Sequence, residues 1–168
     1  AVLRRAIRRA CWPVAYSEGF SPKSRMSFGP SLPVGTVSEC EYVDVDLTAE
    51  LSAADARRTL AAQMPEGFAM LDVVRAPLSS ISIEAAARRA EYRFRLPERL
   101  SPDEMDDAIA EFSASPSCRV TKMSRRGPVD VVLTPLVERL EREGDEVHLV
   151  LRLGTGGFVR PETVAQRV

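Results

Sequence analysis

The chain has 168 residues, of which 45% are hydrophobic and 28% are charged, and its formal net charge is −1. These values are typical of one ordinary globular domain or two small ones, and they exclude a disordered or low-complexity protein. The apolar stretches are far shorter than the roughly 20 residues of a membrane-spanning helix, so we expect no association with a membrane.

Cysteine and histidine are too sparse to predict a metal centre. Cys11, Cys40 and Cys118 form no C-x-x-C pair, which indicates free thiols in a reducing cytoplasm rather than a disulfide framework or a zinc or iron–sulfur motif. His148 is the only histidine, and no cysteine lies near it in the sequence. We therefore expect a packed or solvent-facing histidine, with no metal, no cofactor and no catalytic residue.

The first 76 residues predict a helix, two strands, a helix and a strand. Apolar residues at helical spacing, turn residues and alternating patterns place these elements at 2–11, 25–32, 41–47, 52–63 and 68–75. Ala1 falls inside the first amphipathic pattern without an initiating methionine, so we expect the sequence to be a fragment. One strand before residue 1 would complete a ferredoxin-like βαββαβ unit.

The second half repeats this order after a serine-containing connector at 77–89. Strands are predicted at 90–96, 119–123 and 129–133, a helix at 101–113, a hairpin ending in a strand at 146–153, and a helix from Pro161, while 136–143 is ambiguous. We therefore predict an α+β protein with two ferredoxin-like units, at 1–76 and 90–168, whose sheets are antiparallel and whose first and last strands are absent from this chain. The predicted core comprises Val2, Leu3, Ile7, Phe28, Tyr42, Val45, Leu60, Val73, Phe94, Ile109, Leu149 and Leu151.

A loop at 16–35 has the composition of a single-stranded nucleic-acid site. It combines Tyr16 and Phe28 with Lys23 and Arg25 among turn residues. Aromatic rings that stack on bases and cations that meet phosphates are the usual means of holding a single strand. The alternative is that the rings only pin the loop onto the sheet.

Two further segments add positive charge or backbone donors. The first helix carries Arg8 and Arg9, which contact phosphates or form an ordinary solvated face. Gly156 and Gly157 lie in a loop before Arg160 and a helix start, an arrangement that binds anions in some proteins and is a flexible connection in others. We predict that one nucleic-acid surface joins these segments through Arg8, Arg9, Tyr16, Lys23, Arg25, Phe28, Gly156, Gly157 and Arg160.

Several of these motifs resemble those of a known family. Residues 16–22, 27–30, 32–35 and 39–42, with 156–162 near the end, resemble the radical-SAM-linked protein family, a bacterial domain of unknown function. The resemblance implies a domain that occurs alone or at the end of cobalamin-binding radical SAM proteins, often encoded beside a ribonuclease of the E/G type. The family usually has Asn-Pro-His-Pro where this chain has Ser21-Pro22-Lys23-Ser24, so no role is carried over for that histidine.

Three functions are compatible with these patterns. The first is a noncatalytic RNA-binding or substrate-presenting module that works with a radical SAM enzyme or in RNA metabolism. The second is a protein–protein interaction module that uses a sheet edge or the acidic stretch 39–55 without nucleic acid. The third is an RNA-processing enzyme, to which a looser fold-level likeness to CRISPR repeat-processing endonucleases points; it lacks a clear general base.

Overall fold

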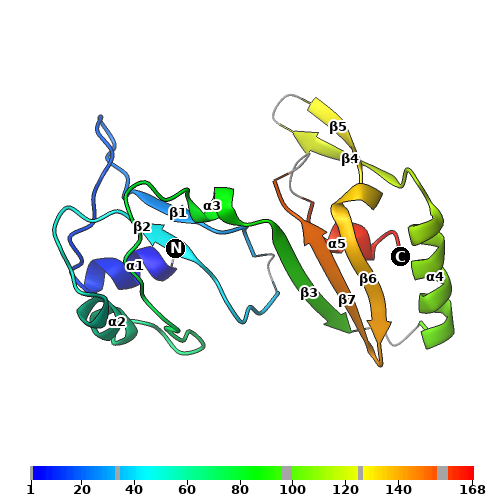
Figure 1. The fold of residues 1–168 in the computed structure, drawn as a ribbon, viewed down its shortest axis with the longest axis horizontal. Helices are drawn as coiled ribbons and strands as arrows, with labels where there is room; N and C mark the ends of the chain where they lie inside the picture. The colour runs from blue at the N-terminus through cyan, green and yellow to red at the C-terminus, as the bar shows by residue number, and fades with distance from the viewer. Residues whose placement is uncertain (1, 33–34, 96–99, 125–126, 155–158) are drawn as a thin grey trace. The chain divides into compact units, whose positions relative to one another are not determined.

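The computed structural model describes residues 2–32, 35–95, 100–124, 127–154 and 159–168 (Figure 1). The chain divides into two compact units, Ala1–Ala86 and Ala87–Val168, which we call unit 1 and unit 2. The division falls within the predicted connector 77–89. In the described ranges, no helix is long and apolar enough to cross a membrane.

Unit 1 contains short elements. In chain order they are α1 (Val2–Arg9), β1 (Met26–Phe28), β2 (Val43–Val45), α2 (Ala53–Ala61) and α3 (Ile83–Ala86). β1 and β2 pair in antiparallel fashion with Ser27 opposite Asp44, and isolated bridges join Val14 to Leu47 and Tyr16 to Ser24. Hydrogen bonding in unit 1 is therefore spread over loops as much as over strands.

The core of unit 1 lies where α1 and α2 meet the small sheet. Ala6, Ile7 and Leu60 are buried there, and half-buried side chains such as Trp12 pack against them. The Trp12 ring Nε1 donates a hydrogen bond to Thr59 Oγ1 at 3.0 Å, which satisfies the polar end of an otherwise apolar ring. This contact joins the end of α1 to α2.

Unit 2 has longer strands and one long helix. Its elements are β3 (Arg89–Arg95), α4 (Pro102–Ala114), β4 (Arg119–Ser124), β5 (Gly127–Val132), a 3₁₀ turn η1 (Thr134–Leu136), β6 (Val137–Glu143), β7 (Glu146–Arg152) and α5 (Pro161–Ala165). β3, β7 and β6 form an antiparallel sheet with β7 in the centre, while β4 and β5 form a separate antiparallel pair.

The core of unit 2 covers one face of the three-stranded sheet. β7 alternates, so that Val147, Leu149 and Leu151 are buried on the face opposite to that of His148 and Val150. Phe112 of α4 and Val164 of α5 belong to the same buried cluster. The sheet therefore has one apolar face and one polar face.

α4 starts at a capping box, in which Ser101 Oγ accepts from Glu104 N and a Glu104 carboxylate oxygen accepts from Ser101 N.

Most predicted elements are present in the described residues, but one predicted strand is not formed and one short helix was not predicted. The α+β class with antiparallel sheets is confirmed, and the ambiguous segment 136–143 lies in strand β6. The predicted strand at 68–75 is wrong, because no strand is formed there, and the short helix α3 was not predicted. The described sheets, of two, three and two strands, do not by themselves establish a duplicated ferredoxin-like unit.

The predicted core was partly correct. Ile7, Leu60, Leu149 and Leu151 are buried, whereas Val2, Phe28 and Tyr42 are exposed. Phe28 lies on the short strand β1, whereas Val2 is the first residue of α1 and Tyr42 immediately precedes β2. Five predicted core residues are half-buried: Leu3, Val45, Val73, Phe94 and Ile109.

Candidate functional site

In unit 1, α1 lies against the segment that follows it. Arg4 of α1 donates from Nη1 to Ser24 Oγ, and its guanidinium carbon lies 5.4 Å from the centroid of the Phe28 ring. A cation over an aromatic face at this distance is attracted by the ring quadrupole. Arg4 therefore joins the basic helix to the aromatic loop.

The residues around Tyr16 to Arg25 form a hairpin held by the backbone. Ser17 N donates to Lys23 O at 2.8 Å, Lys23 N donates to Ser17 Oγ at 3.0 Å, and Arg25 N donates to Ala15 O at 2.8 Å. The Tyr16 side chain is 58% exposed, and Phe20 at the tip is fully exposed. Figure 1 shows this loop, drawn in blue, projecting from the rest of unit 1. These two rings therefore do not pin the loop onto the sheet.

The cations around this hairpin are not equally available. Arg8 lies one turn after Arg4 on the same flank of α1, and Arg9 is also exposed. Lys23 is exposed as well, whereas Arg25 Nη2 lies 2.9 Å from Asp46 Oδ2. Arg25 would therefore have to leave or share this acidic partner to contact a phosphate.

The glycine loop belongs to the other unit. Gly156 and Gly157 lie outside the described residues, and Arg160 is exposed at the start of α5 without a side-chain capping bond. The structure brings α1 and the 16–28 hairpin together within unit 1. That the glycine loop joins them in one surface stays a prediction.

The acidic stretch 39–55 is largely paired within unit 1. Asp44 Oδ2 accepts from Ile83 N at 2.7 Å. The Arg58 hydrogen bond, helped by Ser52 Oγ, lowers the pKa of Asp55 below its ordinary value. The ion pairs are Arg25–Asp46, Arg58–Asp55 at 2.7 Å and Arg75–Glu50 at 3.2 Å. Much of this stretch is therefore not a free anionic face.

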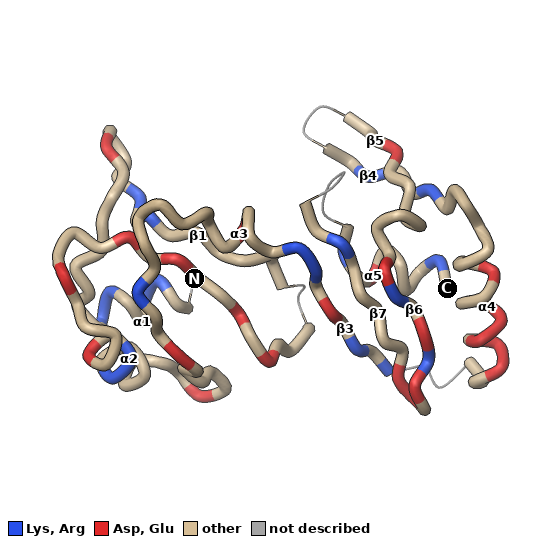
Figure 2. Tube along the Cα trace, viewed as in Figure 1, with Lys and Arg blue, Asp and Glu red and all other residues tan. Residues whose placement is uncertain are grey.

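The polar face of the sheet in unit 2 carries a network that the sequence did not predict. Figure 2 shows basic and acidic residues interleaved along β3 and β6. His148 on β7 lies among them with its side chain only 8% exposed, and its Nε2 is 2.5 Å from Glu91 Oε1. The other ion pairs on this face are Arg89–Glu138, Arg152–Glu138, Arg95–Glu146 and Arg139–Glu141.

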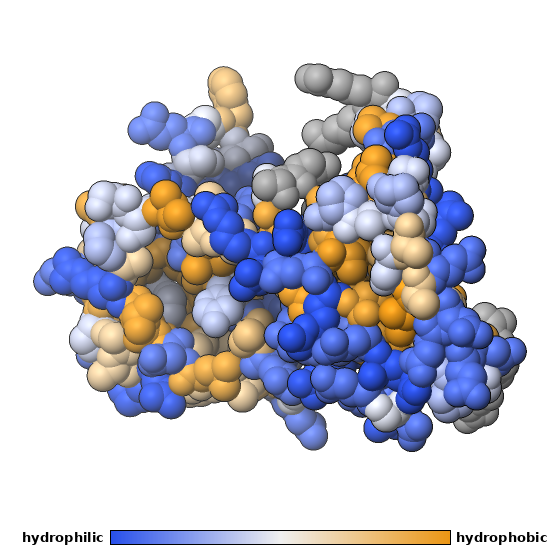
Figure 3. Space-filling view, turned by 45° about the vertical axis from the view of Figure 1, so that its right-hand side comes forward, coloured by the Kyte–Doolittle hydropathy of each residue, from blue (hydrophilic) through white to orange (hydrophobic). Residues whose placement is uncertain are grey.

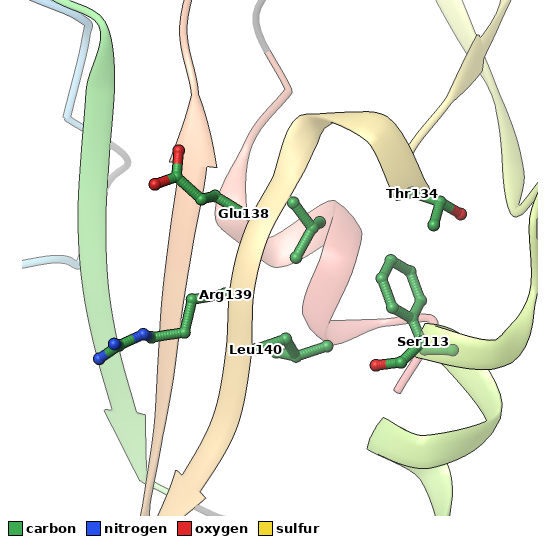
Figure 4. Close-up of a pocket in the computed structure, with 7 residues that line it drawn as sticks. Ser113, Thr134, Glu138, Arg139 and Leu140 are labelled. Carbon is green, nitrogen blue, oxygen red and sulfur yellow. The ribbon is translucent and has the colours of Figure 1, made fainter.

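An open groove of about 230 Å³ lies between α4, η1 and β6. Figure 4 shows Leu140 pointing toward α4, while Arg139 points to the opposite side of β6. The two hydroxyls that line it are already used, because Ser113 Oγ donates to Ile109 O and Thr134 Oγ1 donates to Ser115 O. The charged residues that line it, Glu138 and Arg139, form ion pairs with Arg89 and Glu141, so we place no ligand site there.

The chain matches the model of a family described as uncharacterized proteins conserved in bacteria (DUF2344) over residues 1–161, and it therefore belongs to that family. A search of curated proteins found no match. A search of solved structures also found none.

Proposed function

We propose that this member of an uncharacterized bacterial family is a noncatalytic module that binds single-stranded RNA on unit 1. The binding site is the α1–hairpin surface, which we define as Arg4, Arg8, Tyr16, Lys23 and Phe28. The observation that carries the proposal is the contact of Arg4 with Ser24 and with the Phe28 ring, because it sets a basic helix beside exposed aromatic rings.

Each part of this surface has a separate task. Arg8 and Lys23 are exposed cations that neutralise phosphates. The exposed Tyr16 ring stacks on a base, and the hydrogen-bonded hairpin holds that ring without burying it. Arg4 is held in place by Ser24 and Phe28, so little side-chain entropy is lost when a phosphate binds to it.

The resemblance to the radical-SAM-linked family extends the proposal to a partner. A radical SAM enzyme brings its own iron–sulfur chemistry, so a module of this kind would hold and present the RNA substrate. Arg160 and the loop with Gly156 and Gly157 are the residues of unit 2 that we propose to extend the same RNA-binding function. Arg9 and Arg25 would add weaker contacts.

The test is a titration of a fluorescein-labelled single-stranded RNA of mixed sequence, followed by anisotropy at several salt concentrations. Arg8→Gln should weaken binding of all sequences and flatten the salt dependence by about 0.7 unit, the contribution of one phosphate contact to a single strand. Tyr16→Ala should cost about 1–3 kcal/mol of binding free energy and leave the salt slope unchanged, since stacking releases no counterion.

Two matched variants control for charge and for exposed aromatic area. Arg57 is an exposed arginine on α2, and Phe68 is 53% exposed, close to the value for Tyr16. Arg57→Gln and Phe68→Ala should leave both affinity and slope unchanged. An Arg57→Gln variant as weak as Arg8→Gln would show only nonspecific attraction to unit 1, and the proposed surface would then be abandoned.

A protein–protein interaction module is the second candidate, and one observation favours it. Large apolar side chains are exposed along residues 68–81, which form no helix or strand: Phe68, Leu71, Val74, Leu78 and Ile81. Figure 3 shows hydrophobic side chains reaching the molecular surface among polar ones. An exposed apolar segment of this kind is typical of a contact with another chain.

Crosslinking from native lysate separates the two candidates. The full chain should recover RNA, and Tyr16→Ala with Arg8→Gln should lose it, if the α1–hairpin surface is the functional one. Recovery of protein without RNA, abolished by Leu71→Ser with Val74→Ser but not by the first pair of variants, would favour the interaction module.

A further inference from the structure

His148 is a buried histidine with only one nitrogen satisfied. Its side chain is 8% exposed, and Nε2 lies 2.5 Å from Glu91 Oε1. Because a carboxylate oxygen accepts hydrogen bonds, Nε2 carries the proton, and in a neutral ring Nδ1 is then a free lone pair. Nδ1 is buried and has no hydrogen-bond partner. A buried polar atom without a partner is costly, so it calls for an explanation.

Two carboxylates of β6 lie near His148. Glu143 is close to Nδ1, and Glu141 is directly opposite His148 in the β6–β7 pair. Glu141 on β6 is in register with His148 on β7. Glu143 Oε1 is 3.9 Å from Nδ1, too far for a hydrogen bond. One ligand atom from each of Glu141, Glu143 and His148 lies within 4.8 Å of the others. Three possible ligand atoms thus lie close together on the polar face of the sheet.

We propose that Glu141, Glu143 and His148 bind a divalent first-row transition metal ion, with Zn²⁺ as the preferred occupant. One imidazole nitrogen and two carboxylates are common zinc ligands, and three protein ligands leave the fourth tetrahedral position to water. The ion would satisfy Nδ1 and would neutralise two carboxylates that otherwise repel each other on one strand.

The required movement is small. Zinc bonds of about 2.0–2.1 Å place tetrahedral ligand atoms about 3.3 Å apart, so side-chain rotation must close the present separations by up to about 1.5 Å. The Glu141 and Glu143 side chains are 47% and 57% exposed, which leaves them free to rotate. Glu141 must leave Arg139, whose Nη1 lies 3.2 Å away, and an exposed pair of this kind contributes little.

Glu91 would orient the His148 ring without binding the metal ion itself. Metal-bound histidines usually donate their other N–H to a carboxylate, which fixes the tautomer and orients the ring. Glu91 on β3 accepts from Nε2, so the ring is oriented before any ion arrives. Arg93 lies opposite His148 on β3, and Arg139 is paired with Glu141, so two positive charges near the site oppose a cation.

This proposal departs from the expectation that the chain binds no metal, which considered only spacing along the sequence. Glu141 and Glu143 lie on β6, and His148 lies on the neighbouring strand β7 after one turn; no standard motif has that order. They meet because the hairpin turn at Gly144 sets Glu143 opposite Glu146 and Glu141 opposite His148.

The single histidine makes a direct test possible. The full chain is prepared without a histidine tag, labelled with ¹⁵N-histidine and titrated with Zn²⁺ after chelator treatment. The exposed thiols are removed with Cys11→Ser and Cys40→Ser, so that they do not compete. One equivalent of Zn²⁺ should shift the Nδ1 resonance of His148, while Nε2 keeps its proton. An Nδ1 resonance that does not respond overturns the proposal.

Substitutions of exposed glutamates test each proposed ligand without changing the buried core. Glu143→Gln and Glu141→Gln should each lower Zn²⁺ affinity by at least about 10-fold, and Glu91→Gln should lower it by about 10-fold to 100-fold through loss of ring orientation. Glu138→Gln, on the same strand but paired with Arg89, is the matched control and should bind as the wild type does. Equal affinity in Glu143→Gln, Glu141→Gln and Glu138→Gln would also overturn the proposal.

Discussion

Unit 1 and unit 2 are similar in length but differ in how much of their apolar surface they bury. In unit 2 a sheet of three seven-residue strands, β3, β7 and β6, carries a cluster that contains Leu133, Leu149 and Leu151. In unit 1 the paired strands have three residues each, and the buried cluster is Ala6, Ile7 and Leu60. The buried apolar cluster is thus larger in unit 2 than in unit 1.

The difference follows from strand length. A seven-residue strand places three or four side chains on one face, enough to form a continuous apolar layer, whereas a three-residue strand places one or two. Phe28, the last residue of the three-residue strand β1, is exposed, although the sequence predicted it in the core. The proposed RNA-binding role of the α1–hairpin surface requires rings that are exposed in this way.

The largest expected effect comes from the core of each unit. Leu149→Ala removes a fully buried side chain of unit 2 and should lower the free energy of unfolding of that unit by about 2–5 kcal/mol. Leu60→Ala removes the main buried side chain of unit 1 and should destabilise that unit by a similar amount. Because unit 1 has the smaller core, Leu60→Ala should unfold it at a much lower denaturant concentration.

Trp12 allows the two units to be followed separately. It is the only tryptophan, and it packs in unit 1. The unfolding transition followed by its fluorescence should shift in Leu60→Ala and not in Leu149→Ala. The transition followed by far-ultraviolet circular dichroism, which the longer elements of unit 2 dominate, should shift in Leu149→Ala. A Trp12 transition that shifts equally in both variants would show that the units unfold as one, contrary to the comparison.

A smaller effect is expected at the helix starts, where both units use the same device. Ser52 Oγ accepts from Asp55 N at the start of α2, and Ser101 Oγ accepts from Glu104 N at the start of α4. Ser52→Ala and Ser101→Ala should each cost about 1 kcal/mol of unfolding free energy. Thermal melts followed by Trp12 fluorescence and by circular dichroism should assign each loss to its own unit. Equal shifts of both signals in either variant would contradict that assignment.

The sequence predicted the elements of unit 2 better than those of unit 1, for physical reasons. The alternation of Glu146–Arg152 and the Ser101 cap are local patterns, and they specify β7 and α4 directly. The segment 68–75 has the composition of a strand, but a strand also needs a partner. In the described part of unit 1, β1 pairs with β2, and residues 68–75 pair with neither of them.

The candidate sites show the same limit. Helical spacing placed Arg8 on an exposed flank of α1, but the contact between Arg4 and Phe28 depends on tertiary packing and could not be read from spacing. The register of Glu141 with His148 follows from the predicted hairpin, so this part of the cluster was within reach of the sequence. Glu91 was not, because it lies 57 residues from His148 along the chain.

The smallest expected effect is a loss of stability at acid pH, to which carboxylates of both units contribute. The backbone N–H and the hydroxyl of Ser101 lower the pKa of Glu104, and the Arg142 hydrogen bonds lower the pKa of Asp106. A carboxyl whose pKa is lower in the folded state stabilises the protein at pH values above its ordinary pKa, which is 4.5 for Glu104 and 3.8 for Asp106. That contribution to stability is lost as the pH falls through the lower pKa of the folded state. In unit 1 the hydrogen bond from Arg58 lowers the pKa of Asp55 in the same way.

Asp106→Asn isolates one of these contributions. Arg142 Nη2 lies 2.5 Å from Asp106 Oδ2 and joins β6 to α4, so the variant should melt below the wild type at pH 7. As the pH falls below 3.8 and Asp106 becomes protonated in the wild type too, the two melting temperatures should converge. Asp107→Asn changes the same charge on the same helix without that partner, and its melting temperature should stay close to the wild type at both pH values. A gap between Asp106→Asn and the wild type that persists unchanged into acid would mean that packing, rather than the ion pair with Arg142, joins α4 to the sheet of unit 2.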